Sequence, residues 1–100
     1  MNNILINKNI ELTKLVTKKL PRELQIHLLK LYLNLANGDT IHFFKLSSSG
    51  GASIQKITHI TEDPEYSKVE FLEIVDTIED DEIYIIDRGN KVIMMFVEEY

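Results

Sequence analysis

The sequence of 100 residues contains no cysteine, no tryptophan and only two prolines. Without cysteine the chain can form neither a disulfide nor a thiolate nucleophile, and it lacks the ligand that most structural zinc sites use. Its apolar runs fall well short of the roughly 20 residues that a membrane-spanning helix needs. We therefore expect no membrane partner. The N-terminal stretch MNNILINKNIEL is too short and too polar for a signal peptide, which favours a cytoplasmic protein.

The residues that are present describe a single globular domain. Apolar residues make up 44% of the chain and charged residues 27%, which is typical of a folded protein rather than a disordered one. A chain of this length buries one core. We expect one domain over residues 1–100, with a flexible N-terminal stretch (1–10) and a flexible Ser/Gly loop (47–52).

The net charge of −5 is unevenly distributed along the chain. Residues 1–45 carry a net charge of +4, whereas residues 46–100 carry −9. Solvated surfaces account for such a split without any function. Alternatively, it steers an oppositely charged partner or a second copy of the chain. In that case Lys18, Lys19 and Arg22 would contact an anionic partner, such as a phosphate or an acidic peptide, near the start of the predicted helix.

The main helix is predicted over residues 21–36. Pro21 suits a first helical position, where its missing N–H costs nothing, and Asn37-Gly38 suits a helix end. The apolar arc of this segment is wide, so we expect a deeply embedded helix with one narrow polar face. Gln25 falls inside the apolar arc and needs hydrogen-bond partners there, unless it reaches the surface from the first turn.

Segments rich in strand-forming residues follow the helix, at 40–46, 53–60, 66–75, 82–87 and 91–97. Residues 11–16 form either a short first strand or a lead-in to the helix. In 66–75 the apolar positions change phase, which predicts a bulge near Phe71–Leu72. The last two segments flank Arg88-Gly89-Asn90 and predict a hairpin. The order predicts an α+β domain, in which one main helix packs on an antiparallel sheet of five to six strands that ends in a C-terminal hairpin.

A family resemblance covers residues 11–100. The residues that carry it are Leu20-Pro21 with Gln25 and Leu28, the segments 39–46 (DTIHFFKL), 55–59 (QKITH), 62–66 (EDPEY) and 83–87 (IYIID) with Gly89, and the C-terminal segment 94–100 (MMFVEEY). In these respects the chain resembles the bacterial family known as domain of unknown function 960, found mainly in Firmicutes. It departs from the family in lacking a helix tryptophan and in its Ser/Gly connection, which looks like an insertion. The resemblance implies an α+β fold and a cytoplasmic bacterial origin. It implies no activity, so it assigns no site residue.

Few residues suggest chemistry. His59 precedes Glu62 and Asp63, and a histidine close to carboxylates is a motif of divalent-metal sites. The same residues also describe an ordinary exposed turn around Pro64, so we predict no metal site. The serines cluster in the flexible loop, where no catalytic triad is suggested. We predict no catalytic residue and no cofactor.

Nucleic-acid binding has weak support. The basic cluster near the helix start holds four residues, Lys14, Lys18, Lys19 and Arg22, in an acidic protein. Appreciable phosphate-driven affinity usually rests on roughly six or more contacts. A nucleic-acid partner is therefore the least favoured of the hypotheses below.

The hairpin segments 82–87 and 91–97 raise a structural question, because they hardly alternate apolar and polar residues. One helix covers one face of the sheet. The other face then carries a second apolar set, and a patch of several hundred Å² is larger than monomers usually leave in water. This predicted interaction surface consists of Tyr84, Ile86, Ile93, Met95 and Val97. Its cover is the N-terminal segment Ile4-Leu5-Ile6, a curl of the sheet on itself, a second copy or another protein.

The sequence favours a non-catalytic protein-interaction module that binds another protein, or itself as a homodimer, through its sheet. An alternative is a small-ligand-binding protein or an enzyme with a pocket between helix and sheet, with His59 and Tyr66 as its first polar candidates. The third hypothesis is a nucleic-acid-associated regulator.

Overall fold

The computed structural model describes residues 9–35, 38–48 and 53–100. Within these ranges the chain forms six strands, two α-helices and a C-terminal 3₁₀ turn. The elements are β1 (Asn9–Leu12), α1 (Lys14–Lys19), α2 (Arg22–Asn34), β2 (Ile41–Ser48), β3 (Ile54–Glu62), β4 (Glu65–Glu73), β5 (Asp80–Asp87), β6 (Lys91–Phe96) and η2 (Val97–Glu99).

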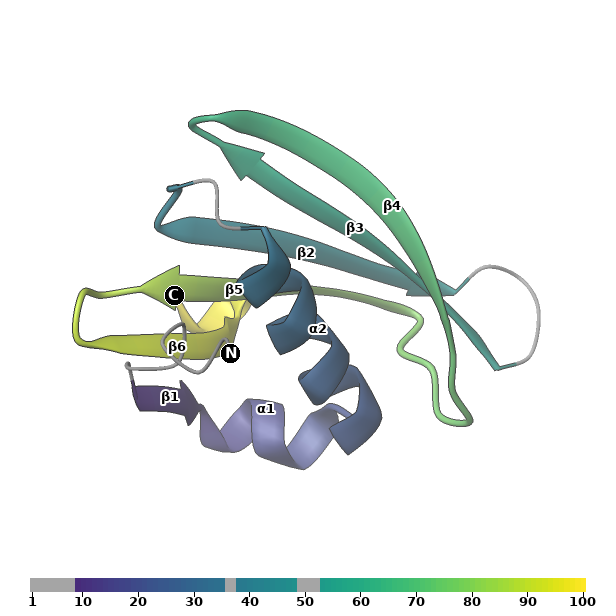
Figure 1. Cartoon of the computed structure of the whole chain (residues 1–100). Coiled ribbons are helices and arrows are strands. Elements are labelled where there is room, and N and C mark those ends of the chain that lie inside the picture. Colours follow the sequence, from purple (N-terminus) through teal and green to yellow (C-terminus); the bar gives the residue numbers. More distant parts are fainter. Residues whose placement is uncertain (1–8, 36–37, 49–52) are drawn as a thin grey trace.

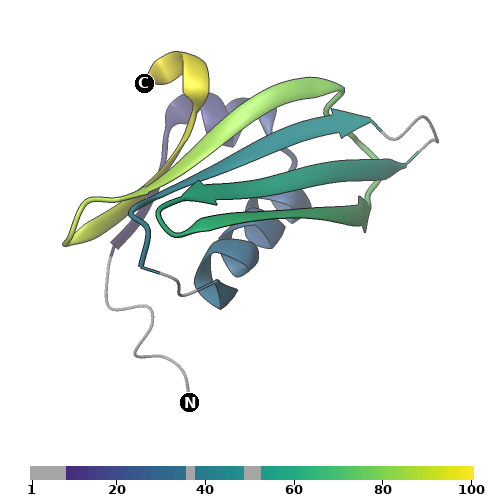
Figure 2. The same cartoon turned by 90° about the horizontal axis from the view of Figure 1, so that it is seen from above.

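The strands form one sheet in the order β1-β6-β5-β2-β3-β4. Neighbouring strands run antiparallel except β1 and β6, which run parallel. Figure 1 shows β4 along one edge of the sheet and β1 at the other, and Figure 2 shows β4, β3, β2 and β5 side by side. The predicted α+β class and the C-terminal hairpin are confirmed. The parallel pairing of β1 was not predicted.

The predicted main helix is confirmed as α2, which begins at Arg22 and ends at Asn34, and a second, shorter helix that was not predicted, α1, precedes it. Thr13 caps α1 through its Oγ1, which accepts a hydrogen bond from the Val16 N–H (3.2 Å), and α1 ends at Leu20 before Pro21 starts α2. Gln25 Nε2 donates to the main-chain oxygens of Val16 (3.3 Å) and Leu20 (2.9 Å). This side chain therefore satisfies carbonyl groups at the end of α1 and fixes the angle between the two helices.

The core lies between these helices and one face of the sheet. Val16 and Leu20 of α1 and Leu24 and Leu28 of α2 are at most 3% exposed. They form one cluster with strand residues Phe44, Leu46, Ile57, Ile83, Ile85, Val92, Met94 and Phe96. The expectation of a deeply embedded α2 is wrong in part, because only Leu24 and Leu28 are fully buried in α2. None of the described helices is long and apolar enough to cross a membrane.

The predicted bulge in β4 is absent. β3 and β4 pair without interruption from Ile54↔Glu73 to Glu62↔Glu65. The change of phase has another cause: Val69 and Phe71 lie on the face away from the helices, whereas Leu72 packs against the core. Both faces of β4 are therefore partly apolar.

Three boundaries also differ from the predictions. Asn9 and Ile10 belong to β1, and Ser47 and Ser48 end β2, so neither pair lies in a loop. Val97 begins η2 and does not end the last strand. The remaining residues of the two predicted flexible segments, 1–8 and 49–52, lie outside the described residues.

One buried side chain ties β3 to its surroundings. Gln55 is fully buried and lies on the helix side of the sheet. Its Nε2 donates to the main-chain oxygens of Ser47 (2.8 Å) and Ile78 (2.9 Å), and its Oε1 accepts a hydrogen bond from the Ile78 N–H (2.6 Å). The amide thus anchors the segment that leads into β5 against β2 and β3.

We predict that Gln55→Leu lowers the free energy of unfolding by about 2–3 kcal/mol, because it leaves the buried main-chain groups of Ile78 without partners. Urea denaturation followed by circular dichroism measures the change. The matched control is Lys56→Gln, which alters a neighbouring side chain on the opposite face and should cost little. Equal stability of the Leu variant and the unmodified protein would contradict the anchoring role.

Candidate functional site

The face of the sheet opposite α1 and α2, called here the open face, carries many apolar side chains. Paired residues of neighbouring strands share a face, so the register places on it Ile41, Phe43, Ile60, Val69, Phe71, Tyr84, Ile86, Ile93 and Met95. Among the large apolar residues, Ile41 is 39% exposed, Val69 44% and Phe71 61%. These apolar residues lie on β6, β5, β2, β3 and β4, and the most exposed of them lie on β2 and β4.

The predicted interaction surface is only partly exposed. Tyr84, Ile86, Ile93 and Met95 lie on the open face, whereas Val97 lies in η2. Ile86 and Met95 are only 5% and 9% exposed, so the chain itself shields this part of the face. The ring of the C-terminal Tyr100 packs edge-on against that of Tyr84 (5.3 Å between centroids). The predicted covering segment, residues 4–6, lies outside the described residues.

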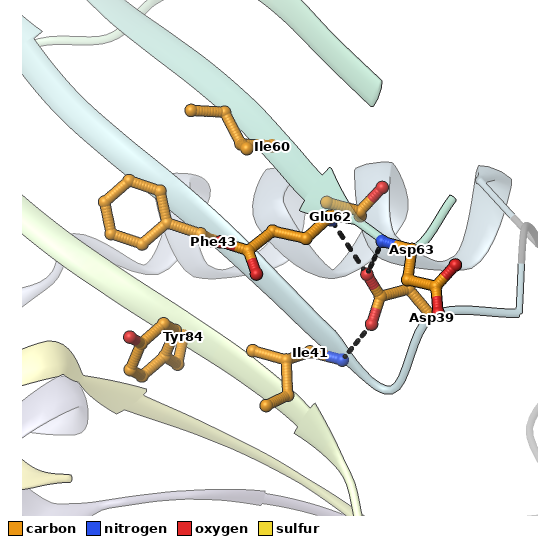
Figure 3. Close-up of a pocket in the computed structure, with 8 residues that line it drawn as sticks. Asp39, Ile41, Phe43, Ile60, Glu62, Asp63 and Tyr84 are labelled. Carbon is orange, nitrogen blue, oxygen red and sulfur yellow. Dashed lines mark hydrogen bonds between the residues drawn. The ribbon is translucent and has the colours of Figure 1, made fainter. Parts of the chain in front are cut away.

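A groove of about 490 Å³ lies on the open face where β2 begins and β3 ends. Its lining residues are Asp39, Ile41, Phe43, Ile60, Thr61, Glu62, Asp63 and Tyr84. Figure 3 shows Ile41, Phe43, Ile60 and Tyr84 on the near side of the strands, with a helix behind the sheet. The rings of Phe43 and Tyr84 meet edge-on at 5.9 Å. The groove therefore has an apolar floor and a carboxylate rim at one end.

Asp39 holds that rim together. Its Oδ1 accepts a hydrogen bond from the Ile41 N–H (3.1 Å), and its Oδ2 accepts from the N–H groups of Glu62 (2.9 Å) and Asp63 (3.0 Å). The hydrogen bond from the Asp63 N–H, with the others, lowers the pKa of Asp39 to about 2, because these donors stabilise the ionised carboxyl. The carboxylate thus joins the start of β2 to the β3–β4 turn, and it fixes the end of the groove.

A buried histidine pair lies on the other face, beneath α2. His42 Nδ1 and His59 Nε2 are 2.8 Å apart and share one hydrogen bond. The ring of Phe44 stacks on His59 (4.3 Å between centroids), and the ring of Tyr32 meets His42 edge-on (4.8 Å). Burial lowers the pKa of His42, and burial together with His42 lowers the pKa of His59 to about 4. Both imidazoles are therefore neutral at pH 7.

This placement separates the residues of the hypothetical metal motif. His59 is 2% exposed and faces the core, whereas Glu62 lines the groove on the open face. Among the residues that the structure describes, no three His, Asp or Glu side chains gather closely enough to hold a metal ion.

The alternative site between helix and sheet takes a different form from the one predicted. His59 and Tyr66 do contact each other edge-on (5.4 Å), but the His59 ring is packed within the core. A hollow of about 290 Å³ lies between α2 and the end of β4. Neither His59 nor Tyr66 lines it; its lining residues are Glu23, Ile26, His27, Lys30, Leu72, Glu73 and Ile74.

The basic residues of the predicted anion-binding cluster do lie together. Lys18 and Lys19 end α1, Arg22 begins α2, and all three are exposed. Lys19 Nζ lies 5.6 Å from the centre of the Phe96 ring. Their proposed contact with an anionic partner stays a prediction.

Sequence reasoning missed the role of Asp39. A local signal existed, because an aspartate two residues before a strand residue often accepts that residue's N–H, as Asp39 does with Ile41. Its bonds to residues 62 and 63 depend on β2 and β3 being neighbours, which no short motif encodes.

Comparison with known proteins supports the fold. No family model matches the chain, and no curated protein does. The chain is similar to a solved structure, the crystal structure of a protein of unknown function from Enterococcus faecalis. The TM-score is 0.76 over 93% of this chain and 91% of that one, at 16% sequence identity. This similarity shows the fold alone, and membership of the family known as domain of unknown function 960 stays a prediction.

The histidine pair predicts a loss of stability in mild acid. The pKa of His59 is about 4 in the folded protein, against 6.5 for an ordinary histidine, so the unfolded chain binds the proton more readily. Stability is therefore complete above pH 6.5 and falls as the pH drops towards 4. Urea denaturation should show a free energy of unfolding about 1–2 kcal/mol lower at pH 5 than at pH 7.

The control for this prediction is His59→Gln, which keeps a neutral polar group and removes the titration. Its stability should differ less between pH 7 and pH 5 than that of the unmodified protein. A His59 ring that titrates near 6.5 by NMR in the folded protein would show that the pair does not exclude the proton.

Proposed function

We propose that this protein is a non-catalytic protein-interaction module, and that its groove binds a segment of another protein carrying an apolar side chain beside a lysine or arginine. The observation that carries the proposal is the groove itself. An apolar floor, on a sheet face that neither α1 nor α2 covers, ends at a rim of carboxylates, and it lies away from the histidines.

The floor supplies the apolar part of the recognition. Ile41 is 39% exposed, and Phe43, Ile60 and Tyr84 are half-buried beside it. Antiparallel sheets with one face in water usually carry polar side chains on that face. Burying apolar surface stabilises a complex by about 25 cal/mol per Å². The edge-on contact of Phe43 and Tyr84 holds both rings in place, which lowers the entropy cost of binding.

The rim supplies the charge. Glu62 and Asp63 are exposed at the end of the groove, and Asp39 fixes their backbone through two hydrogen bonds. They belong to the half of the chain with a net charge of −9. A cationic side chain of the partner would therefore be attracted, and salt would weaken that attraction, since the Debye length is about 8 Å at 0.15 M.

The neutral histidines support binding rather than catalysis, because they lie on the other face, packed among Phe44, Tyr32 and Tyr66. We also propose a cytoplasmic bacterial setting. The absence of cysteine is consistent with a reducing compartment, and the similar solved structure comes from a bacterium.

The test is selection of binding peptides from a random-peptide phage library with the unmodified protein. We expect the selected peptides to combine an aromatic or branched apolar residue with lysine or arginine. By calorimetry, Ile41→Ser should weaken their binding about ten-fold, since losing about 1.4 kcal/mol of apolar contact has that effect. Glu62→Lys should weaken it most at low salt.

The matched control is Ile26→Ser on α2, where an isoleucine of similar exposure (44%) lies outside the groove. It should leave peptide affinity unchanged. Selected peptides whose binding ignores both Ile41→Ser and Glu62→Lys would contradict the proposal.

A further inference from the structure

β4 is an unusually open sheet edge. It is nine residues long and ends the strand order, and among the described residues no strand pairs with its outer side (Figure 1). Such an edge presents a row of main-chain N–H and C=O groups that can pair with another strand. Proteins usually protect edges with short strands, charged side chains, bulges or proline. The charges of β4 include a pair of opposite sign, Lys68 and Glu70, which a second copy could match. Within Glu65–Glu73 the strand has neither proline nor bulge.

The side chains of this edge suit pairing. On the open face, Val69 is 44% exposed and Phe71 61% exposed. On the helix side, Lys68 and Glu70 are successive side chains of the strand, and Lys68 Nζ lies 3.4 Å from Glu70 Oε2. Their side chains are 59% and 29% exposed, so both can reach a strand laid alongside.

A second copy of β4 fits this edge in one register better than in its neighbours. Antiparallel pairing of two identical strands must keep each side chain on its own face, so the register changes in steps of two residues. Centring the two-fold axis on Lys68 opposes Lys68 to itself, and centring it on Glu70 opposes Glu70 to itself. Centring it on Val69 places Lys68 of each copy opposite Glu70 of the other.

We propose that this protein forms a symmetric dimer in which two β4 strands pair antiparallel about Val69 and join the two sheets into one. The dimer contains two Lys68–Glu70 cross-strand pairs, one on each side of the axis. On the open face, Val69 meets Val69, and Phe71 lies opposite Ser67 of the second copy. Such a contact is closed and self-complementary, so it stops at two copies. It uses the edge and not the groove, and it stands independently of the groove proposal.

The arrangement predicts a specific pattern of charge reversal, which sedimentation equilibrium measures. The unmodified chain should show a monomer–dimer equilibrium. In the Lys68→Glu protein, the new glutamate of each copy faces Glu70 of the other. In the Glu70→Lys protein, the new lysine of each copy faces Lys68 of the other. Each substitution should weaken dimerisation about ten-fold or more, because an opposite-charge pair becomes a like-charge pair twice.

Rescue of dimerisation by compensating charges is the decisive part of the experiment. Mixing the Lys68→Glu and Glu70→Lys proteins opposes glutamate to lysine at every pair, so a mixed dimer should form more readily than either variant alone. The double variant Lys68→Glu/Glu70→Lys should dimerise like the unmodified chain, and it also shows that reversed charges allow folding. The control is Lys91→Glu on β6, away from the β4 edge, which should change nothing.

Three results would overturn the proposal. They are a monomer at every concentration up to millimolar, a dimer that both single variants leave intact, and single variants that the mixture does not rescue. Ile41→Ser should not affect the dimer, so loss of peptide binding in that variant and loss of dimerisation at the edge are distinguished.

Discussion

Side chains alternate between the two faces of a β-sheet, and this geometric constraint decides what the rest of the molecule does. Residues 83–86 of β5 and 92–96 of β6 are all apolar, so burying one set of side chains turns another set to the opposite face. Two short helices suffice to cover one face, where Phe44, Ile85 and Met94 are fully buried. The open face is left with Ile41, Val69 and Phe71 in contact with water. Both proposed surfaces follow from this surplus of apolar positions.

A few polar side chains keep this arrangement rigid by satisfying main-chain groups. Gln25 joins α1 to α2, Gln55 anchors the segment before β5, and Asp39 joins β2 to the β3–β4 turn. Each acts where a regular element ends and its main-chain groups would otherwise lack partners. The last of these contacts fixes the shape of the groove, since Asp39 accepts hydrogen bonds from the main-chain N–H groups of Glu62 and Asp63.

The sequence predicted what depends on local rules. Pro21 marks the start of α2, although it is the N-cap residue and not the predicted first helical residue, and Gly89 with its positive φ permits the turn between β5 and β6. Non-local features were missed. The parallel pairing of β1 with β6 joins the two ends of the chain, and no residue pattern in Asn9–Leu12 signals it. The prediction of a bulge near Phe71 was wrong, because both faces of β4 are partly apolar and this alone produces the change of phase.

The candidate site was also predicted only in part, because the local pattern assigns side chains to a face but does not decide which of them stay exposed. Tyr84, Ile86, Ile93 and Met95 were correctly assigned to a common face by alternation. Their exposure depends on what the chain folds over them, so the uncovered region lies instead at Ile41, Val69 and Phe71. The His42–His59 contact required the pairing of β2 with β3, in which Phe44 lies directly opposite His59 and His42 lies one diagonal step away.

The central claim is that Ile41, Val69 and Phe71, on the open face between β2 and β4, are exposed to water in the isolated chain. Methyl NMR with a soluble paramagnetic relaxation agent tests it directly in dilute protein. The methyl groups of Ile41 and Val69 should relax as strongly as that of Ile26, which is similarly exposed, while Ile57 in the core stays unaffected. If Ile41 and Val69 were instead as protected as Ile57, the chain would cover its own second face, and the claim would be contradicted.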